Sequence, residues 1–483
     1  MNTSPTDSMK RYYFCFLFIL CYPLLSPYAY AQNKVRIACI GNSITYGHGL
    51  TNREQNSYPG QLQTLLGANY EVMNFGVSSK TIIRNVDNSY VDTPAYQQAL
   101  KSNPDLVFIK LGTNDSRLPY RLQINRFVPD YKLLIQTIKA LPTHPRIILL
   151  SPVASFLTDT TRQTDQAISA LVIPRIQQVA FDEKCELIDL HALFIDHPDY
   201  FPDKLHPDSL GTAVIAKRLY EAVISQEEKG FDFFKTINEP VKVSSFYGYD
   251  CADFVLDGRA CKVVKPRRAA KGLPWIWRAR FWGHEPQTDI ALLDRGFHVV
   301  YCDVAELFGN AQAITAWNNF YAFARKAGLA PKVALEGLSR GGVYIYNWAA
   351  ANPEKVACVY ADAPVLDLKS WPGGKGKSKG SLADWEIFKK DYGLISEEQA
   401  LAFTGNPIDK VADIVNGHYP LLHVVGDIDE GVPVSENTAP FEEKVKALGG
   451  QIQVIHKPNI GHHPHSLPNP TPIVDFILNA THP

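Results

Sequence analysis

Two short serine motifs, each directly after an apolar run, constrain the fold of this chain more than any other feature. Residues 41–45 (GNSIT) follow the apolar run 35–40, and residues 337–341 (GLSRG) follow the apolar run 332–335. A serine in such a position lies at the turn between a strand and a helix, at the edge where open α/β sheets bind their ligands. The chain is therefore expected to contain two sheets, each ending in a serine turn.

Each motif belongs to its own alternation of strand-like and helix-like sequence. Strands that alternate with helices predict a parallel sheet with helices on both faces. In the first half the expected strands are 35–40, 106–111, 147–150 and 186–190, with helices such as 131–140 and 166–181. In the second half they are 275–278, 298–302, 332–335, 356–360, 421–425 and 451–455, with helices such as 311–327 and 473–478.

The two alternations predict two domains, because 483 residues exceed what one core usually supports. We place the first domain at 32–228 and the second at 241–483, with a linker at 229–240. The second domain opens with a hairpin whose turn is Asp257-Gly258, a dipeptide that favours two-residue hairpin turns. An insertion at about 370–413 interrupts its rhythm with a glycine- and lysine-rich stretch, and we interpret it as a loop or lid.

The first 31 residues follow the plan of a secretory signal. Lys10 and Arg11 precede an apolar stretch, 12–25, and Ala29-Tyr30-Ala31 offers small residues where a signal peptidase would cut. We therefore expect a signal peptide at 1–31, export, and a periplasmic location. The alternative is a single N-terminal membrane anchor, which we disfavour because the apolar stretch is short and broken by Pro23. No later segment is long and apolar enough to span a bilayer.

Charge and cysteine content exclude several classes of function. A net charge of −1 argues against a nucleic-acid-binding surface. The cysteines beyond the signal have no metal-type spacing. Cys251 and Cys261 flank the Asp257-Gly258 turn, but the register about that turn does not place them opposite each other, which disfavours a disulfide.

The first serine has a candidate base and acid on one short segment. A serine hydroxyl is a weak nucleophile that needs a base, and the base needs an orienting acid. Residues 203–207 (DKLHP) supply both, because Asp203 and His206 lie three residues apart. One loop can thus present His206 to Ser43 with Asp203 behind it.

The oxyanion of the reaction also needs hydrogen-bond donors. Residues 112–115 (GTND) follow a strand and can present the side-chain amide of Asn114. Residues 74–78 (NFGVS) can present the backbone N–H of Gly76, where a side chain would block approach.

These four blocks, in this order and register, resemble those of the SGNH (GDSL-like) hydrolases over about 34–228. The resemblance implies a flavodoxin-like three-layer α/β/α sandwich and ester hydrolysis through an acyl-serine. It assigns Ser43 as nucleophile, His206 as base and Asp203 as its partner, with Gly76 and Asn114 as oxyanion donors. The departure is Asn42, where many members have Asp, although the G-N-S form also occurs.

The second serine lies in a G-x-S-x-G elbow. Glycine on both sides allows the sharp strand-to-helix turn that lifts the Ser339 hydroxyl clear and points the N–H of Arg340 into the oxyanion site. A second N–H should follow the strand at 275–278, and Arg278 and Ala279 are the candidates.

The acid and base of this site should follow the elbow in chain order. Asp429 lies after an apolar strand in a G-x-x-D-x-x-V-P pattern, and Asp427 is the alternative. His462 directly follows Gly461 and is our base. The remaining alternatives for the base are His463 and His465.

The half from about 241 to the end thus resembles an α/β-hydrolase, in strand spacing, elbow, acid and histidine. A metal site is another interpretation of its clustered histidines, 462–465. We disfavour that interpretation because no carboxylate or cysteine joins them at ligand spacing. No cofactor is implied either, because serine acyl transfer needs none.

The expected substrate is an esterified oligo- or polysaccharide. Secreted chains that pair an SGNH half with an α/β-hydrolase half resemble bacterial carbohydrate esterases, which favours acetylesterase activity in the first domain. Pectin-type methyl ester hydrolysis at the second site, or one half acting as a silent sugar-binding module, are the alternatives.

Two residue types bear on the kind of sugar. Arginines near the second serine, Arg278, Arg280 and Arg340, can grip a carboxylate, which motivates the hypothesis of a uronic-acid-containing substrate. All seven tryptophans lie between Trp275 and Trp385. They indicate either sugar stacking or core packing.

Overall fold

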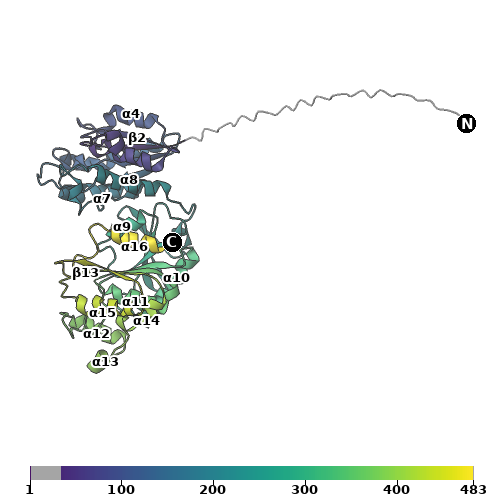
Figure 1. Cartoon of the computed structure of the whole chain (residues 1–483), viewed down its shortest axis with the longest axis vertical. Coiled ribbons are helices and arrows are strands. Elements are labelled where there is room, and N and C mark those ends of the chain that lie inside the picture. The colour runs from purple at the N-terminus through teal and green to yellow at the C-terminus, as the bar shows by residue number, and fades with distance from the viewer. Residues whose placement is uncertain (2–33, 482–483) are drawn as a thin grey trace.

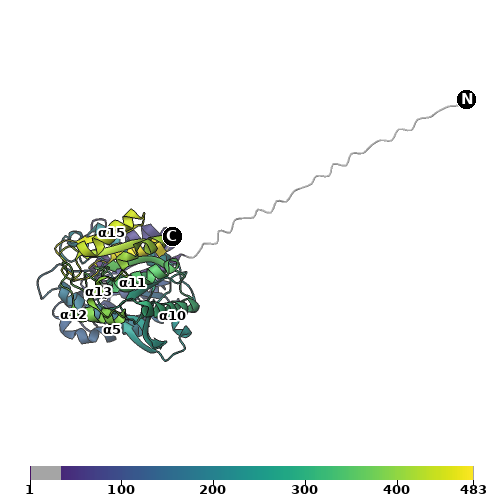
Figure 2. The same cartoon turned by 90° about the horizontal axis from the view of Figure 1, so that it is seen from below.

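The computed structural model describes residues 34–481 together with Met1 (Figure 1). The expected signal peptide at 1–31 therefore lies outside the described residues, and its cleavage stays a prediction. The chain forms two α/β domains stacked along the long axis, with the purple-to-teal first domain above the green-to-yellow second in Figure 1. In the view from below, the second domain lies in front of the first (Figure 2). Between residues 34 and 481 no helix has the length and apolar character needed to cross a membrane.

The sheet of the first domain is parallel throughout and has the strand order β2-β1-β3-β4-β5. This is the flavodoxin-like order, in agreement with the fold that the resemblance to the SGNH hydrolases implied. The prediction omitted β2, whose residues are half-buried at the sheet edge and form no apolar run. The strands are β1 (Val35–Gly41), β2 (Tyr70–Gly76), β3 (Leu106–Lys110), β4 (Arg146–Leu150) and β5 (Glu186–Ile188).

Helices cover both faces of this sheet, so the domain has three layers. Alternate residues of a strand point to opposite faces. Ile37 and Cys39 of β1 pack with α3 (Tyr58–Leu66) and α8 (Ser209–Ile224), whereas Ala38 and Ile40 face α5 and α7. The other helices are α1 (Ser43–Tyr46), α2 (Arg53–Asn56), α4 (Pro94–Lys101), α5 (Phe127–Lys139), α6 (Asp165–Ala167) and α7 (Ile173–Glu183).

The sheet of the second domain has the order β14-β13-β12-β11-β9-β10-β8-β7-β6. Strands from β9 onward pair in parallel, and β6, β7 and β8 form an antiparallel edge. This arrangement confirms the predicted α/β-hydrolase architecture. The strands are β6 (Lys242–Phe246), β7 (Tyr249–Leu256), β8 (Arg259–Lys265), β9 (Trp275–Ala279), β10 (His298–Cys302), β11 (Val333–Leu338), β12 (Val356–Asp362), β13 (Leu421–Gly426) and β14 (Ile452–Lys457).

The hairpin of this edge turns where the sequence predicted. Asp257 and Gly258 both have positive φ, as the favoured two-residue turn requires. The resulting register places Cys251 opposite Val264, and the six described cysteines are buried and free.

Two groups of helices cover the two faces of the second sheet. The group α9 (Gln287–Leu293) and α16 (Thr471–Thr481) packs on the face toward the first domain (Figure 1). The opposite face carries α10 (Ala311–Ala327), α11 (Gly341–Ala351), α14 (Val411–Asn416) and α15 (Thr438–Ala447).

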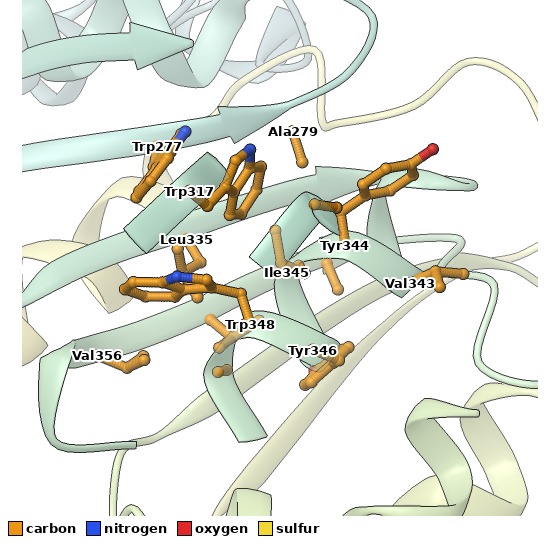
Figure 3. Close-up of a cluster of buried hydrophobic side chains, with 14 of the residues drawn as sticks. Trp277, Ala279, Trp317, Leu335, Val343, Tyr344, Ile345, Tyr346, Trp348 and Val356 are labelled. Carbon is orange, nitrogen blue, oxygen red and sulfur yellow. The ribbon is translucent and has the colours of Figure 1, made fainter. Parts of the chain in front are cut away.

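A tryptophan cluster fills the core between β9 and the helices α10 and α11. Trp277 stacks on Trp317 with ring centroids 4.4 Å apart, and Trp348 packs against both (Figure 3). Trp275 and Trp277 are fully buried. These two rings therefore belong to the core, and the interpretation that they stack on a sugar is wrong for them.

The insertion at 370–413 is a folded part of the second domain. It contains α12 (Leu382–Asp391) and α13 (Glu397–Leu401), and it buries Trp385 and Phe388 in the core. Its glycine-rich stretch is held by Glu436, whose carboxylate accepts a hydrogen bond from Ser370 Oγ at 2.6 Å and another from the backbone of Lys377. The insertion therefore lies over the loop that follows β13.

The two domains share a buried polar interface. Arg218 of α8 pairs with Asp294 at the end of α9 at 2.7 Å, and both side chains are almost fully buried. The Tyr249 hydroxyl donates to the carbonyl of Leu187 at 3.0 Å. The segment 229–240 also packs firmly, because Phe233 is buried in the core of the second domain. The connecting segment is thus part of the second domain's packing.

Candidate active sites

The first serine is positioned by a tight turn between β1 and α1. Ser43 is the first residue of α1, and Asn42 caps the helix by accepting a hydrogen bond from the Ile44 N–H at 3.2 Å. Gly41 ends the strand, and a Cβ there would lie 2.0 Å from Thr45 Oγ1 and 2.9 Å from the Lys110 carbonyl. Glycine is therefore required for the turn that presents the serine.

Ser43, His206 and Asp203 form a continuous relay. His206 Nε2 lies 2.8 Å from Ser43 Oγ, and His206 Nδ1 lies 2.6 Å from Asp203 Oδ2. The other oxygen of Asp203 accepts the backbone N–H groups of Leu205 and His206, at 3.0 and 2.7 Å. The loop thus fixes its own acid, and the acid fixes the tautomer of the base.

The electrostatics of the relay keep the base neutral and the acid ionised. Burial lowers the pKa of His206 below its usual value and outweighs the hydrogen bond to Asp203, with the charges of His48 and Lys110 acting in the same direction as burial. Burial alone would raise the pKa of Asp203, but the hydrogen bonds from His206 and the backbone lower it. A neutral imidazole beside an ionised carboxylate is the arrangement that general-base catalysis needs.

Asn114 lies at the end of β3, where an oxyanion donor was predicted. Its Oδ1 accepts a hydrogen bond from Gln163 Nε2 at 2.8 Å, and its Nδ2 donates to the Lys80 carbonyl at 2.9 Å. Nδ2 carries two N–H groups, so this contact leaves a second donor on the same atom. The amide is thus oriented from both sides, and Gln163 is a positioning residue that no motif indicated.

Gly76 does not have the role that the sequence predicted. Its N–H donates to Asn74 Oδ1 at 2.9 Å, and a Cβ on it would lie 2.2 Å from the backbone nitrogen of Tyr46. The glycine is required because α1 packs directly against it, and its N–H is already engaged. The loop segment that contacts Asn114 lies further along, at Lys80.

The second serine occupies a strained elbow. Ser339 has φ +51 between β11 and α11, a conformation that costs energy for a residue with a side chain. A Cβ on Gly337 would lie 2.8 Å from the backbone of Gly341, and one on Gly341 would lie 2.8 Å from the Ala279 carbonyl. The N–H of Arg340 lies at the first turn of α11, where helix N–H groups lack acceptors within the helix.

Ser339, His462 and Asp429 form a second relay from separate parts of the chain. His462 Nε2 lies 2.9 Å from Ser339 Oγ, and His462 Nδ1 lies 2.6 Å from Asp429 Oδ2. The other oxygen of Asp429 accepts the N–H groups of Gly431 and Val432, both at 2.8 Å. The side chain of Asp429 is 1% exposed, compared with 54% for Asp203 in the first relay.

The alternative residues of the second site have other partners. His465 is buried and binds Asp362 through Nδ1 at 2.7 Å, and Asp427 binds His456 at 2.6 Å. His463 is exposed and lies beside His462, with ring centroids 5.0 Å apart. Among these residues, His462 alone contacts the serine.

Arg278 does not face a substrate, contrary to the prediction. Its guanidinium is fully buried between Asp289 and Glu336, 2.5 and 3.0 Å away. The two carboxylates raise the pKa of Arg278 against the effect of burial. The side chain therefore ties β9 to β11 beneath the elbow, because a buried guanidinium needs nearby anions.

Arg340 lies at the second site but is already paired. Its Nη1 donates to Asp384 Oδ1 at 2.5 Å, and its guanidinium lies 5.5 Å from the ring centre of Phe308 and 5.6 Å from that of Trp371. Asp384 comes from the insertion, and no motif indicated the pair. Burial and the nearby Arg280 lower the pKa of Arg340.

The first domain matches a known family. Residues 39–214 match the model of the GDSL-like Lipase/Acylhydrolase family, so the N-terminal domain is a GDSL-like acylhydrolase domain, as its motifs predicted. An acetylxylan esterase from Xylanibacter ruminicola is 35% identical over 210 residues, a match that covers 40% of this chain and 44% of that protein. The chain thus matches less than half the length of this relative.

Solved structures of two kinds align with parts of the chain. A carbohydrate acetylesterase from Sinorhizobium meliloti is 16% identical and covers 39% of this chain and 98% of its own, with a TM-score of 0.33. An acylaminoacyl peptidase from Pyrococcus horikoshii is 16% identical and covers 47% of this chain and 38% of its own, with a TM-score of 0.35. Each alignment leaves more than half of this chain uncovered.

Proposed function

For a GDSL-like acylhydrolase domain joined to an α/β-hydrolase domain, we propose a carbohydrate esterase with two independent serine sites. The observation that carries this proposal is the pair of complete serine–histidine–aspartate relays, each with both hydrogen bonds at 2.6–2.9 Å. A domain that served only as a silent sugar-binding module would have no need of such a relay. The first domain's family supports ester hydrolysis directly.

Both sites would use the same sequence of steps. The serine hydroxyl gives its proton to the histidine Nε2 as its oxygen attacks the ester carbonyl carbon. The tetrahedral oxyanion, held by nearby N–H donors, collapses and expels the alcohol, which takes the proton from the histidine; the alcohol is the sugar hydroxyl of an acetyl ester or methanol from a methyl ester. Water then attacks the acyl-serine, again through the histidine, and releases the acid and the free serine.

For the first site we infer acetyl esters on a polysaccharide as the substrate. The name of the Xylanibacter ruminicola relative, acetylxylan esterase, supports this choice of acyl group and of substrate class. The shallow, half-exposed position of the Asp203–His206 loop also suits a bulky polymer, because the acid side chain is 54% exposed. Export to the periplasm belongs to the same proposal, since polysaccharides are met outside the cytoplasm.

For the second site a specific observation favours an acidic sugar. Arg340 directly follows the nucleophile, and its guanidinium lies beside the stacked rings of Phe308 and Trp371. A guanidinium there can bind a carboxylate or the carbonyl of its methyl ester, and the partly exposed ring of Trp371 can pack against a sugar. Acetylated or methyl-esterified uronic-acid chains are therefore the proposed substrates of this site.

The test is a pair of single variants, Ser43→Ala and Ser339→Ala, in the full chain. On acetylated xylan, Ser43→Ala should lose at least about 10⁴-fold in acetate release and Ser339→Ala should keep it. On acetylated or methyl-esterified pectin, Ser339→Ala should lose ester release and Ser43→Ala should keep it. If neither variant changes ester release, the two-site proposal fails; if only one does, the other domain has a different function.

Arg340→Ala tests the acidic-sugar assignment at the second site. It should raise KM for uronic-acid-containing esters about tenfold or more, since a charge-assisted contact is lost. Its kcat on a neutral aryl acetate should change by a few-fold at most. An equal loss on both substrates would contradict the assignment.

A further inference from the structure

Two loops that are far apart in the sequence meet at the rim of the second active site. His284 and Glu285 follow β9, and His463 and His465 follow the catalytic His462 after β14. The ring centres of His284 and His463 lie 5.9 Å apart, and those of His463 and His465 lie 4.7 Å apart. The fold thus gathers imidazoles and a carboxylate at one place beside the base.

The spacing of these side chains matches that of metal ligands. One ligand atom from each of His284, Glu285 and His463 lies within 4.8 Å of the other two. Atoms bound to one ion at about 2 Å lie within that separation of one another. This carboxylate is the group whose absence from the local sequence argued against a metal, and it comes from another strand end.

The cluster is also held in place by surrounding hydrogen bonds. The backbone N–H of His465 donates to Glu285 Oε2 at 2.6 Å, and His465 Nδ1 binds the fully buried Asp362 at 2.7 Å. Hydrogen bonds of this kind, one step removed from an ion, orient ligands in known metal sites. The exposed rings of His284 and His463 give an ion a path from solvent.

We propose that His284, Glu285 and His463 bind a divalent transition-metal ion of the zinc class. Two imidazoles and one carboxylate are a donor set that suits Zn²⁺ and disfavours Mg²⁺ or Ca²⁺, which prefer all-oxygen ligands. With three protein ligands, the fourth position stays open to water. The ion joins the loop after β9 to the loop that carries the catalytic histidine.

The bound ion should inhibit the Ser339 site selectively. His463 is the neighbour of His462, and their ring centres are 5.0 Å apart. Each acyl transfer converts His462 to an imidazolium, and a dication close by raises the energy of that charged form. Ser43 lies in the other domain and should not respond. This part of the inference rests on the proposed function, whereas the binding itself does not.

Binding is tested by calorimetric titration of the full chain with ZnCl₂. The unaltered protein should bind one Zn²⁺ at this site, and His284→Ala and His463→Ala should each weaken binding at least tenfold. Glu285→Gln keeps nearly the same side-chain shape but removes the carboxylate, and it should also weaken binding. His418→Asn removes an exposed histidine of the same domain, at a φ of +54 that asparagine tolerates, and should leave binding unchanged. Unchanged binding in the three cluster variants would overturn the proposal.

Inhibition is tested separately for each site. In the Ser43→Ala background, Zn²⁺ should reduce Ser339-dependent ester release at least tenfold, and EDTA or His463→Ala should restore it. In the Ser339→Ala background, Zn²⁺ should have no effect. If Zn²⁺ binds but Ser339 shows no activity without it, the proposed function fails and the metal site stands. If Ser339 is active but the protein does not bind Zn²⁺ and its activity does not respond to it, the metal site is refuted and the proposed function stands.

Discussion

The two serine sites have the same three catalytic side-chain types but differ in how far apart the acid and base lie in the sequence and in how deeply the acid is buried. At Ser43 the acid and base lie three residues apart on one loop, and the acid is half exposed. At Ser339 the acid and base lie 33 residues apart on two strand ends, and the acid is buried. In the first site one local loop positions the acid and the base, whereas in the second site the arrangement of the sheet's strands positions them.

The difference extends to the oxyanion donors. In the proposed function the donor of the first site is a side-chain amide, that of Asn114, which Gln163 and the Lys80 carbonyl orient. The proposed donor of the second site is the backbone N–H of Arg340, at the N-terminus of α11. A local loop with a side-chain donor can be altered one residue at a time, whereas a backbone donor changes only when the elbow does.

The largest expected effect is the loss of kcat when the acid of either site is replaced, and it should differ between the two acids. Asp429→Asn should lower kcat at the Ser339 site about 10⁴-fold, because a buried amide holds the histidine in the wrong tautomer. Asp203→Asn should lower kcat at the Ser43 site less, about 10²- to 10³-fold, because water reaches the exposed acid and screens the change. Initial rates on the substrate of each site measure both. Equal losses would remove the proposed contrast between a local and a buried acid.

The next effect concerns the oxyanion. Asn114→Ala should reduce kcat at the Ser43 site about 10²- to 10³-fold with little change in KM, since one donor to the transition state is lost. Arg340→Ala is the matched change at the other site, and it should spare kcat on a neutral ester because the backbone donor remains. A large kcat loss in Arg340→Ala with a neutral ester would mean that the second oxyanion also depends on a side chain.

A stability change tests whether the two domains act as one body. Arg218→Met leaves Asp294 buried with Arg295 as its remaining partner at 2.9 Å, and should cost about 3 kcal/mol of unfolding free energy. Lys446→Met removes the exposed pair with Glu442 and should cost less than about 0.5 kcal/mol. Urea denaturation followed by tryptophan fluorescence measures both. An equal, small change would show that the buried interface pair contributes little.

The smallest effect is a shift in pH dependence at the Ser43 site. The base acts when neutral, and its pKa is lowered, so activity should persist below pH 6.5 and fall as pH drops through the lowered value. The charge of His48, whose ring lies 4.7 Å from that of His206, contributes to this lowering. His48→Gln should therefore move the acid limb of kcat/KM toward higher pH. A shift toward lower pH would contradict the assigned direction.

Local features of both sites followed from the sequence. The Asp203–His206 spacing, the two serine turns and the two α/β domains could be predicted because each depends on neighbours within one segment or on the alternation of strands and helices. β2 escaped detection because an edge strand lacks the continuous apolar run that marks a buried one.

The remaining errors concern side chains whose role depends on what faces them. Gly76 was correctly marked as a position that needs glycine, but the reason is the backbone of Tyr46 and not a substrate. Arg278 was assigned to a substrate because it lies at the end of the strand beside the serine elbow, yet it points into a buried pair of carboxylates. A strand's pleat decides which way a side chain points, and the neighbouring elements decide what it meets.

The sequence by itself determined that this chain builds two α/β domains and places a serine at the end of a strand in each. Those properties follow from apolar periodicity and from short motifs, which are local. The sequence favoured His462 as the base, but only the tertiary structure shows that it contacts Ser339 while His463 and His465 do not. Likewise, only the tertiary structure pairs Arg340 with Asp384 and brings Glu285 to the histidines. These choices depend on the direction in which separate strand ends approach one another, and no local spacing encodes that direction.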